Sequence, residues 1–486
     1  MRRRSIIAIV CCVALMLPCG CITAETRSRE HRENMLRNRI LPPKPHVTQP
    51  APIPKRPISL QEAVEIALKN NHTLREALED TGIAGDEKDM ARALFLPVVS
   101  AGYAYHRSDR QNAALIAPDD PRVPPFIMSS EEFRTAEVKL MMTIWDFGRS
   151  LGTYNQAMLG QEISGLVYDR TRQRVILNVV MAYFDVLRAR RGRIIAEESL
   201  AQANEHLKTA ISFEKYGVVD MNDVLRAKVQ AAEVKQMVIK AKNAVELAVS
   251  RLNSVLGINV NSPTRVIDDT GIVPFSLSLK DCLRLAIEHR PEFEIVQKSI
   301  RIEEEGISTV RAGYLPRIYL AGGYNWDDDD HVRYADSSGG LHRSNISGMI
   351  GIKIDLFSGG KTTAEMRRAR KRLAKSEEKA KEVCDGISLQ VKAAFLAVHE
   401  ARERIKVTEQ AMVQAEENLR LMNNKYRENV VTSIDVVDAE TLLTRSKQNY
   451  YTALYDYIVS LARLENATGA DLNGKKAAAD NAGKHK

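Results

Sequence analysis

The stretch ISGMIGIKIDLFSGGK, residues 346–361, decides the fold class. Every second residue from Ile346 to Leu356 is apolar or glycine, whereas Ser347, Lys353 and Asp355 stand among the residues between them. An alternation of this kind over about 10 residues is typical of a strand that crosses a membrane, with one side toward lipid and one wetter side. The glycines that follow permit a sharp change of direction, and a helical pattern begins directly after them. The residues predicted to face lipid are Ile346, Gly348, Ile350, Ile352, Ile354 and Leu356.

An earlier segment alternates in the same way and ends at Asp146-Phe147-Gly148-Arg149. Its apolar row consists of Ala136, Val138, Leu140, Met142 and Ile144. Aromatic residues fall near the ends of the predicted strands, where transmembrane sheets carry aromatic girdles. These aromatic residues are Tyr103, Tyr105, Trp145, Tyr324 and Trp326. A soluble, half-buried sheet has the same alternation, so the pattern by itself fits both kinds of sheet.

The chain contains an internal repeat. Ser59 and Ser278 begin similar segments 219 positions apart, and the same offset places Ala93-Leu94-Phe95-Leu96-Pro97 on Ala312-Gly313-Tyr314-Leu315-Pro316. Each copy continues with a strand after Leu-Pro, a polar loop, a second strand and two long helical segments. Because self-similarity over this length indicates duplicated architecture, we expect both copies to fold alike.

The helical segments keep a strict seven-residue spacing of apolar residues. One row in the second copy is Val391, Val398, Ile405, Met412, Leu419 and Tyr426. A second row, Val436, Leu443, Tyr450, Tyr457 and Leu464, matches Val224, Ala231, Val238, Val245 and Leu252 of the first copy. Sustained heptads predict supercoiled helices with knobs-into-holes packing. At about 1.5 Å per residue, 65 residues reach about 100 Å, which is several times the thickness of a bilayer.

If the strands span a membrane, their number determines how many copies of the chain are needed. After the N-terminal segment, no stretch reaches the roughly 20 apolar residues of a membrane helix, so a spanning protein would have to use strands. Four strands cannot close a barrel of useful bore, and an open edge in lipid is too costly. Three chains with four strands each would supply twelve.

The N-terminus has the pattern of an export signal. Arg2, Arg3 and Arg4 precede a short apolar core, Ile6 to Leu17. Two processing routes fit: Leu17-Pro18-Cys19-Gly20-Cys21 resembles a bacterial lipobox and predicts lipidation of Cys21, whereas the small residues up to Ala24 fit ordinary cleavage before Glu25. Both routes take the protein out of the cytoplasm.

Other functional classes find little support. The formal net charge of +8 is spread over helical segments together with acidic residues, so we expect no nucleic-acid partner. Cys282 and Cys384 are too few for a disulfide framework, and no motif for a catalytic, metal or cofactor site stands out. The aspartates at 327–330 could bind calcium, but they lack EF-hand spacing, and a solvated loop is the favoured interpretation.

These observations predict six segments. They are a signal peptide (1–24), a Pro-rich linker (25–57), a first repeat (58–256, strand pair about 98–146), an inter-repeat linker (257–276), a second repeat (277–468, strand pair about 317–357) and a polar C-terminal tail (469–486).

The order of these elements, given twice, resembles the TolC-type outer-membrane efflux protein family over roughly residues 58–469. The lipobox-like segment resembles the lipid-anchored branch of that family. The resemblance implies a mainly α protein with membrane β-structure: a homotrimer whose twelve-stranded β-barrel crosses the outer membrane of a Gram-negative-type cell. A long α-helical coiled-coil barrel would continue it through the periplasm. The implied partners are a periplasmic adaptor (membrane fusion) protein, an inner-membrane transporter and outer-membrane lipid.

The resemblance also implies a gated aperture at the turn of the second helical hairpin. Asp435 and Asp438 are three residues apart and share one helix face. They match the Asp-x-x-Asp arrangement that lines the family's periplasmic aperture, so threefold symmetry would place six carboxylates around one axis. The alternative is that both are first-turn aspartates that stabilise the start of the helix.

A latch at the closed tip is implied in the same way. Tyr426 matches the tyrosine of the family's closed-state network, and Asp223 matches its acidic partner on the first hairpin. The arginine expected four residues before Asp435 is replaced by Val431, so Arg427 could serve in its place or the latch could be weaker. The first hairpin turn is predicted to be two residues shorter than the second.

The expected function is therefore that of a passive exit duct in a tripartite efflux or type I secretion system, without enzymatic activity or a cofactor. The alternative is a secreted structural coiled-coil scaffold without a pore. Such a scaffold would explain the heptads but not the four alternating strands.

Overall fold

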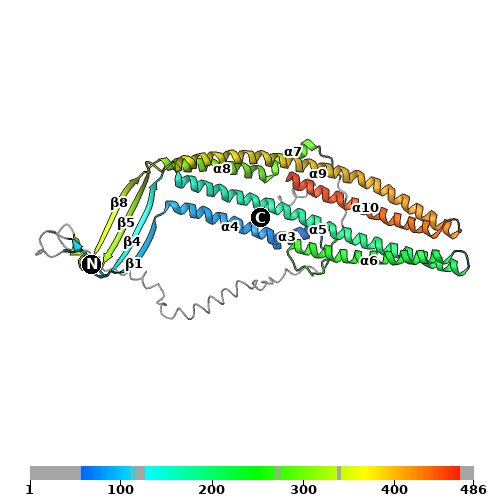
Figure 1. Cartoon of the computed structure of the whole chain (residues 1–486). Helices are drawn as coiled ribbons and strands as arrows, with labels where there is room; N and C mark the ends of the chain where they lie inside the picture. The colour runs from blue at the N-terminus through cyan, green and yellow to red at the C-terminus, as the bar shows by residue number, and fades with distance from the viewer. Residues whose placement is uncertain are drawn as a thin grey trace. The chain divides into compact units, whose positions relative to one another are not determined.

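Two helices of 67 residues each, α5 (Arg149–Lys215) and α9 (Lys361–Arg427), run from the sheet at one end to the helical turns at the other (Figure 1). Each is about 100 Å long at 1.5 Å per residue. The structure is a computed structural model that describes residues 56–110, 113–114, 126–268, 271, 274–335 and 341–470. The predicted signal peptide, Cys21 and nearly all of both terminal segments lie outside these residues. The other helices are α3 (Leu60–Asn70), α4 (His72–Arg92), α6 (Met221–Leu256), α7 (Leu279–His289), α8 (Pro291–Arg311) and α10 (Ser433–Thr468), with short 3-10 turns η1 (Ala93–Phe95) and η2 (Ala312–Tyr314).

The internal repeat is confirmed by the helical hairpins. α5 and α9 have the same length and begin 212 positions apart, and the 36-residue helices α6 and α10 have the same offset. The prediction of a shorter first turn is wrong: residues 216–220 join α5 to α6 and residues 428–432 join α9 to α10, so each turn has five residues. Equal turns keep both hairpin tips at the same height.

Short helices fill the gaps between the long ones. α4 packs on α5, and α8 packs between α5 and α9, so one end of the helical layer has the order α4–α5–α8–α9. Toward the turns, α6 and α10 take the places of α4 and α8. The ends meet closely: Asn71 Nδ2 donates a hydrogen bond to the carbonyl of Val255 (2.8 Å), and Gly257 lies with φ +70° against the backbone of Asn70.

A buried ion network closes the second junction, between α10 and α8. Arg290, only 5% exposed, donates to the carbonyl of Ala467 at the end of α10 (3.3 Å) and is paired with Glu292. Arg170 from α5 contacts the same Glu292 (2.8 Å) and the carbonyl of Asn466 (3.0 Å). Cations at a helix C-terminus stabilise its free carbonyl groups. The network therefore joins α5, α8 and α10 at one point.

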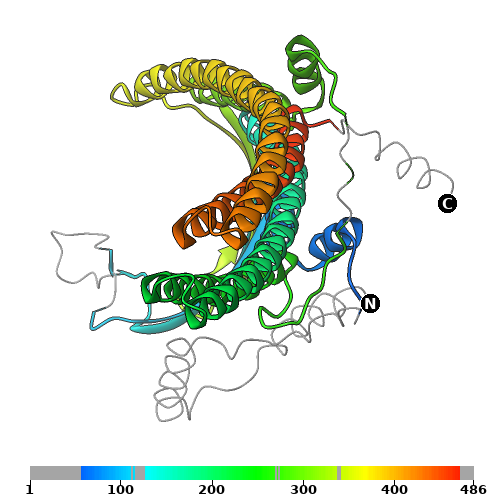
Figure 2. The same ribbon diagram turned by 90° about the vertical axis from the view of Figure 1, so that its right-hand side faces the viewer.

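The predicted heptad rows form the packed seams. Val391, Val398, Val436 and Leu464 are at most 1% exposed, and Leu252 is fully buried. α7 packs against the α9–α10 pair through Cys282 and Ala286. Figure 2 shows the long helices in an arc, with α3 and α7 on its convex side.

The sheet has four antiparallel strands in the order β1–β4–β5–β8. They are β1 (Val98–Arg107), β4 (Glu132–Trp145), β5 (Arg317–Asp327) and β8 (Ser344–Lys353). Two minor pairs, β2 (Ala113–Ala114) with β3 (Phe126–Ile127) and β6 (Tyr334–Ala335) with β7 (Leu341–His342), lie in the connections. β1 and β8 are the edges, and each has a neighbour on one side only among the strands of the described residues.

The alternation holds in the strand centres and fails at three predicted positions. The register pairs Arg317 with Lys353, so the next residues are Pro316 and Ile354. Because proline has no N–H for the ladder, the pairing stops there, and Ile354 and Leu356 lie beyond β8. In β4 a bulge falls between Thr143 and Trp145, so Ile144 leaves the apolar row. Among the described residues, no helix has the length and apolarity needed to cross a membrane.

Candidate periplasmic aperture and hairpin tips

Asp435 and Asp438 lie in the first turns of α10, and both are exposed. Asp435 forms a capping box with Thr432, whose N–H (2.8 Å) and hydroxyl (2.7 Å) both donate to its carboxylate. These hydrogen bonds hold the pKa of Asp435 below its usual value. Asp435 therefore stabilises the helix start and remains charged, whereas Asp438 has no hydrogen bond or ion pair among the described residues.

Tyr426 sits at the centre of an aromatic cluster between the hairpins. Its ring lies 4.9 Å from the ring of His206 and 5.6 Å from that of Phe213, centroid to centroid. It is 2% exposed, and its hydroxyl is buried with no hydrogen-bond partner among the described residues. Burial raises the pKa of Tyr426, and the charge of Asp223 raises it further.

The three residues of the predicted latch do not bond to one another within one chain. Asp223 is half-buried in the first turn of α6, and its backbone carbonyl accepts a hydrogen bond of 3.5 Å from Ser433. Arg427 is exposed at the end of α9 and forms no ion pair with the described residues. The structure thus brings Tyr426 and Asp223 to one site and leaves Arg427 facing outward.

Sequence reasoning missed a polar seam between α5 and α10. His206 Nε2 lies 2.8 Å from the Ser433 hydroxyl, and the Ser199 and Thr444 hydroxyls are 2.5 Å apart. Glu440, one turn before Thr444, is 5% exposed, and burial raises its pKa to about 7. Burial also lowers the pKa of His206. The sequence did contain a signal for this seam. Ser199 and His206 are seven residues apart, and so are Ser433 and Glu440, which is the spacing of a helix-packing row.

A second polar contact ties three helices together. The Asp456 carboxylate on α10 accepts hydrogen bonds from Arg188 on α5 (2.6 Å) and Arg404 on α9 (2.7 Å). These residues border a hollow of about 430 Å³. The same face also carries Asp185, Glu400 and Arg463, so positive and negative charges are equal in number. The arrangement is that of an ion-paired helix contact.

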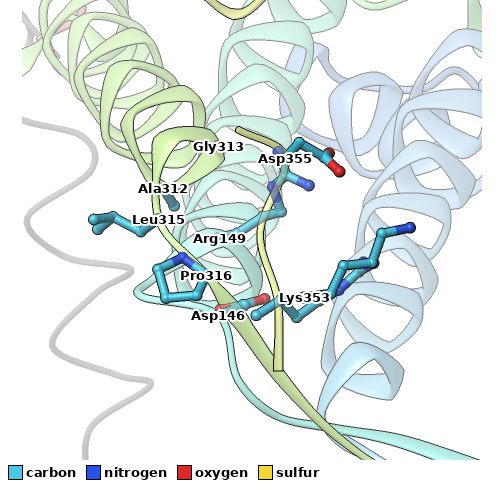
Figure 3. A pocket seen from close by; sticks show the side chains of 9 residues that line it. Asp146, Arg149, Ala312, Gly313, Leu315, Pro316, Lys353 and Asp355 are labelled. Carbon is cyan, nitrogen blue, oxygen red and sulfur yellow. The ribbon is translucent and has the colours of Figure 1, made fainter. Parts of the chain in front are cut away.

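At the junction of sheet and helices, a small polar hollow has Asp146, Arg149, Lys353 and Asp355 among its lining residues (Figure 3). Asp146 accepts hydrogen bonds from the N–H (2.9 Å) and hydroxyl of Ser150 and so caps the first turn of α5. Phe147 and Gly148 both have positive φ, 54° and 95°, and turn the strand into the helix. The charges here stabilise a change of direction.

The four aspartates of the second loop are engaged within the chain. Asp328 and Asp330 pair with Arg343, and the carboxylate of Asp329, 1% exposed, accepts hydrogen bonds from the N–H and hydroxyl of Ser130. Among the described residues, no group of three or more acidic, histidine or cysteine side chains could hold a metal ion. The loop is held by its own ion pairs.

Long helices continue directly into an antiparallel sheet whose strands alternate as membrane strands do, and charged residues stand at the hairpin tips at the far end. Comparison with known proteins identifies the class. The family model described as "Outer membrane efflux protein" matches residues 63–258 and 282–470. The chain belongs to the outer membrane efflux protein family.

Individual relatives match most of the chain. Outer membrane protein TolC of Vibrio cholerae is 24% identical over 418 residues, covering 85% of this chain and 90% of the relative. Alkaline protease secretion protein AprF of Pseudomonas aeruginosa is 20% identical over 424 residues, covering 85% and 84%. The crystal structure of outer membrane protein VceC of Vibrio cholerae has a TM-score of 0.70 at 17% identity, covering 85% and 97%.

The predicted mainly helical fold with a few strands and two repeats, the outer-membrane location and the channel function are thereby confirmed. The protein is an outer-membrane channel component of an export system, extending from the outer membrane into the periplasm. Its family is one of channel proteins.

Proposed function

We propose that three copies of this chain form one continuous duct, gated at the hairpin tips. The observation that carries this proposal is the pair of open sheet edges. β1 and β8 each have a free row of backbone N–H and C=O groups, and in lipid each unpaired group costs several kcal/mol, of the order of 2–7. Pairing β8 of one copy with β1 of the next satisfies every edge, and three copies give a barrel of twelve strands.

Exposed apolar side chains on the outer helices support the same assembly. Leu225 and Val229 on α6 are 53% and 59% exposed, and Leu389 and Leu396 on α9 are 68% and 56% exposed. Each pair has the four- or seven-residue spacing of a helix-packing face. α6 and α9 are the outermost helices of the hairpin pair, so these faces lie where neighbouring copies would meet.

The aperture is formed in this proposal by Asp435 and Asp438 of three copies. Carboxylates about 4 Å apart repel by about 4 kcal/mol at an effective dielectric of 20, so a ring of six would attract cations or bound water. Both side chains are exposed in the single chain and stand on one helix face, which supports the ring. The hydrogen bonds from Thr432 do not remove the charge of Asp435.

The test is block of the channel by multivalent cations in planar bilayers. Asp435→Asn with Asp438→Asn removes both charges and keeps the oxygen that accepts the capping hydrogen bonds. We expect the double variant to need at least about tenfold more trivalent cation for half-block, since a loss of about 1.4 kcal/mol in binding is tenfold. Equal block in the variant and the wild type would remove the ring assignment.

The latch in this proposal joins Tyr426, Asp223 and Arg427 across neighbouring hairpins in the closed trimer. The buried Tyr426 hydroxyl and the exposed Arg427 support it, because neither has a side-chain hydrogen-bond partner among the described residues. A buried hydroxyl without a hydrogen bond destabilises the protein. The Tyr426 hydroxyl would therefore form a hydrogen bond with a polar group of a neighbouring hairpin that moved only slightly closer.

The same proposal includes a periplasmic adaptor protein and an inner-membrane transporter as partners, and either efflux or type I secretion as the setting. The relatives include both outer membrane efflux protein BepC of Brucella suis and the alkaline protease secretion protein AprF, which supports this range. Lipidation of Cys21 belongs to the proposal as well. Mass spectrometry of the mature N-terminus tests it: an acylated Cys21 is expected, and a free Glu25 N-terminus would refute it.

Extraction separates the duct from a pore-free scaffold. A scaffold bound to the membrane surface is released by high pH or salt, whereas a transmembrane sheet leaves the membrane only with detergent. We expect the whole protein to stay in the membrane pellet after a high-pH wash.

A further inference from the structure

The two outer edges of the helical layer carry opposite charge. In α9, the nine residues from Arg367 to Lys375 include six cationic side chains and no acidic one. All six, Arg367, Arg368, Arg370, Lys371, Arg372 and Lys375, are exposed, and none is part of an ion pair among the described residues. We call this group of six residues the basic edge.

The helix at the other edge of the layer, α4, carries the opposite charge. From Glu76 to Asp89 it carries six acidic residues and a single lysine, Lys88, whose amine is hydrogen-bonded to Gln161 (2.8 Å). The acidic edge consists of Glu76, Glu79, Asp80, Asp86, Glu87 and Asp89. All six are exposed and none is part of an ion pair among the described residues.

Each edge points away from the rest of its own chain. On α9, buried Ala369 marks the side that packs inward, and Arg367 and Lys371 stand two residues to either side of it, about 200° around the helix. On α4, Ala77 and Ala84 are buried.

Glu79 and Asp86 follow these alanines by two residues and point the opposite way in the same manner. α4 and α9 are the first and last helices of the order α4–α5–α8–α9, and Figure 1 shows them at opposite edges of the layer.

The two edges also lie at the same height. α4 ends at Arg92, just before the sheet, and α9 begins at Lys361, just after it. At 1.5 Å per residue, the acidic edge covers about 5–24 Å from the sheet end of its helix, and the basic edge covers about 9–21 Å. Copies related by rotation about an axis along the duct therefore bring one edge opposite the other.

We propose that the acidic edge of one copy binds the basic edge of the next, so that charge fixes a head-to-tail seam between subunits. The occupant of each edge is a second copy of this chain. Two acidic edges, or two basic edges, would repel, which disfavours a twofold dimer. A head-to-tail contact closes into a ring when the rotation between neighbouring copies divides a full turn, as it does in the proposed trimer. The proposal rests on the trimer of the proposed function and deepens it.

Charge reversal tests the seam. Variant A carries Glu79→Lys and Asp86→Lys, and variant B carries Arg367→Glu and Lys371→Glu. The control, Arg301→Glu with Arg311→Glu, changes exposed charges on α8, which has a neighbour on both sides. The readout is the temperature at which detergent-purified trimers dissociate on a native gel.

We expect variants A and B each to lower this temperature by about 5 °C or more at about 10 mM salt, and the control to leave it unchanged. The chain with all four substitutions should recover, because the residues that point directly outward from the two edges are again opposite in sign. At about 1 M salt, where the Debye length is about 3 Å, the differences should vanish.

Trimers that contain both variant A and variant B provide a second test of the seam. When A and B are made together, the outward-pointing residues of A are all basic and those of B all acidic, so the two variants complement each other. A ring of three must still contain one seam between two copies of the same variant. The mixed trimers should therefore be intermediate, below the fourfold variant.

Three results would overturn the seam. They are trimers of A and B as stable as the wild type, no recovery in the fourfold variant, or a change of ion selectivity with unchanged trimers, which would place the basic edge in the lumen. A wild type that is monomeric in detergent would instead refute the proposed function.

Discussion

Replacing Glu440 by glutamine should stabilise the contact between α5 and α10, and the gain should grow with pH. Glu440 is 5% exposed, and burial raises its pKa from 4.5 to about 7. The charged carboxylate is disfavoured there because it has lost water and gained no hydrogen bond among the described residues. Glutamine keeps the size of the side chain and carries no charge.

The magnitude follows from the two pKa values. Below pH 4.5 the carboxyl is protonated in both the folded and the opened states, so it does not affect their balance. As the pH rises from 4.5 to 7, only the opened state loses the proton freely, and the folded state becomes relatively less stable. The full difference is about 3 kcal/mol at 1.4 kcal/mol per pKa unit, reached near pH 7 and above, and about 1 kcal/mol of it is present at pH 5.

Hydrogen exchange of the α5 and α10 amides, converted to opening free energies, is the assay. The difference between Glu440→Gln and the wild type should rise by about 2 kcal/mol from pH 5 to pH 8. Taking this difference cancels His206, whose lowered pKa makes stability fall as the pH drops below 6.5. Glu409→Gln, an exposed control on α9, should show no trend. A difference for Glu440 that does not change with pH would show that its carboxyl ionises normally, and would refute the reasoning.

Three further predictions concern packing, backbone and gating. Leu464→Ala should cost about 2–5 kcal/mol of unfolding free energy because the side chain is fully buried, whereas Leu442→Ala, 48% exposed, should change it by less than about 0.5 kcal/mol; denaturant melts in detergent measure both. Gly257→Ala should cost more than about 1 kcal/mol, since φ is +70° and the new Cβ would collide with the backbone at the end of α3; Gly192→Ala, in open space on α5, should gain up to about 1 kcal/mol in the same melts. Tyr426→Phe should raise the open probability about fivefold per subunit in bilayers if the latch hydrogen bond is worth about 1 kcal/mol; an unchanged open probability would remove Tyr426 from the latch.

The parts of the fold that repeat in the sequence were predictable. The heptad rows through Val391 and Val436 identify the helices and their buried sides, because a seven-residue spacing keeps one apolar row along one side of a helix. The Leu-Pro steps and the glycines near Phe147 locate the changes between helix and strand. These sequence features do not determine the register in which the strands pair. The bulge beside Ile144 depends on the partner strand, and the end of β8 depends on Pro316 in the strand beside it.

The functional residues were predictable only where they repeat a known pattern. Asp435 and Asp438 are visible as a spaced pair, but the capping of Asp435 by Thr432 is a local geometry that the spacing alone did not choose. Glu440 and His206 were missed because the seven-residue spacing that they keep with Ser433 and Ser199 does not show which side of a helix is packed, and only the packing of α10 on α5 buries them. Burial, which sets their pKa values, is a property of the tertiary contact.

The most direct test of the channel function in the proposed trimer is the single-channel conductance of the purified protein in planar lipid bilayers. Stepwise, long-lived conductance from protein that migrates as a trimer is the predicted result, because edges β1 and β8 pair between copies and leave a wet lumen. Protein that inserts and remains silent at all voltages, or conducts as a monomer, would contradict it.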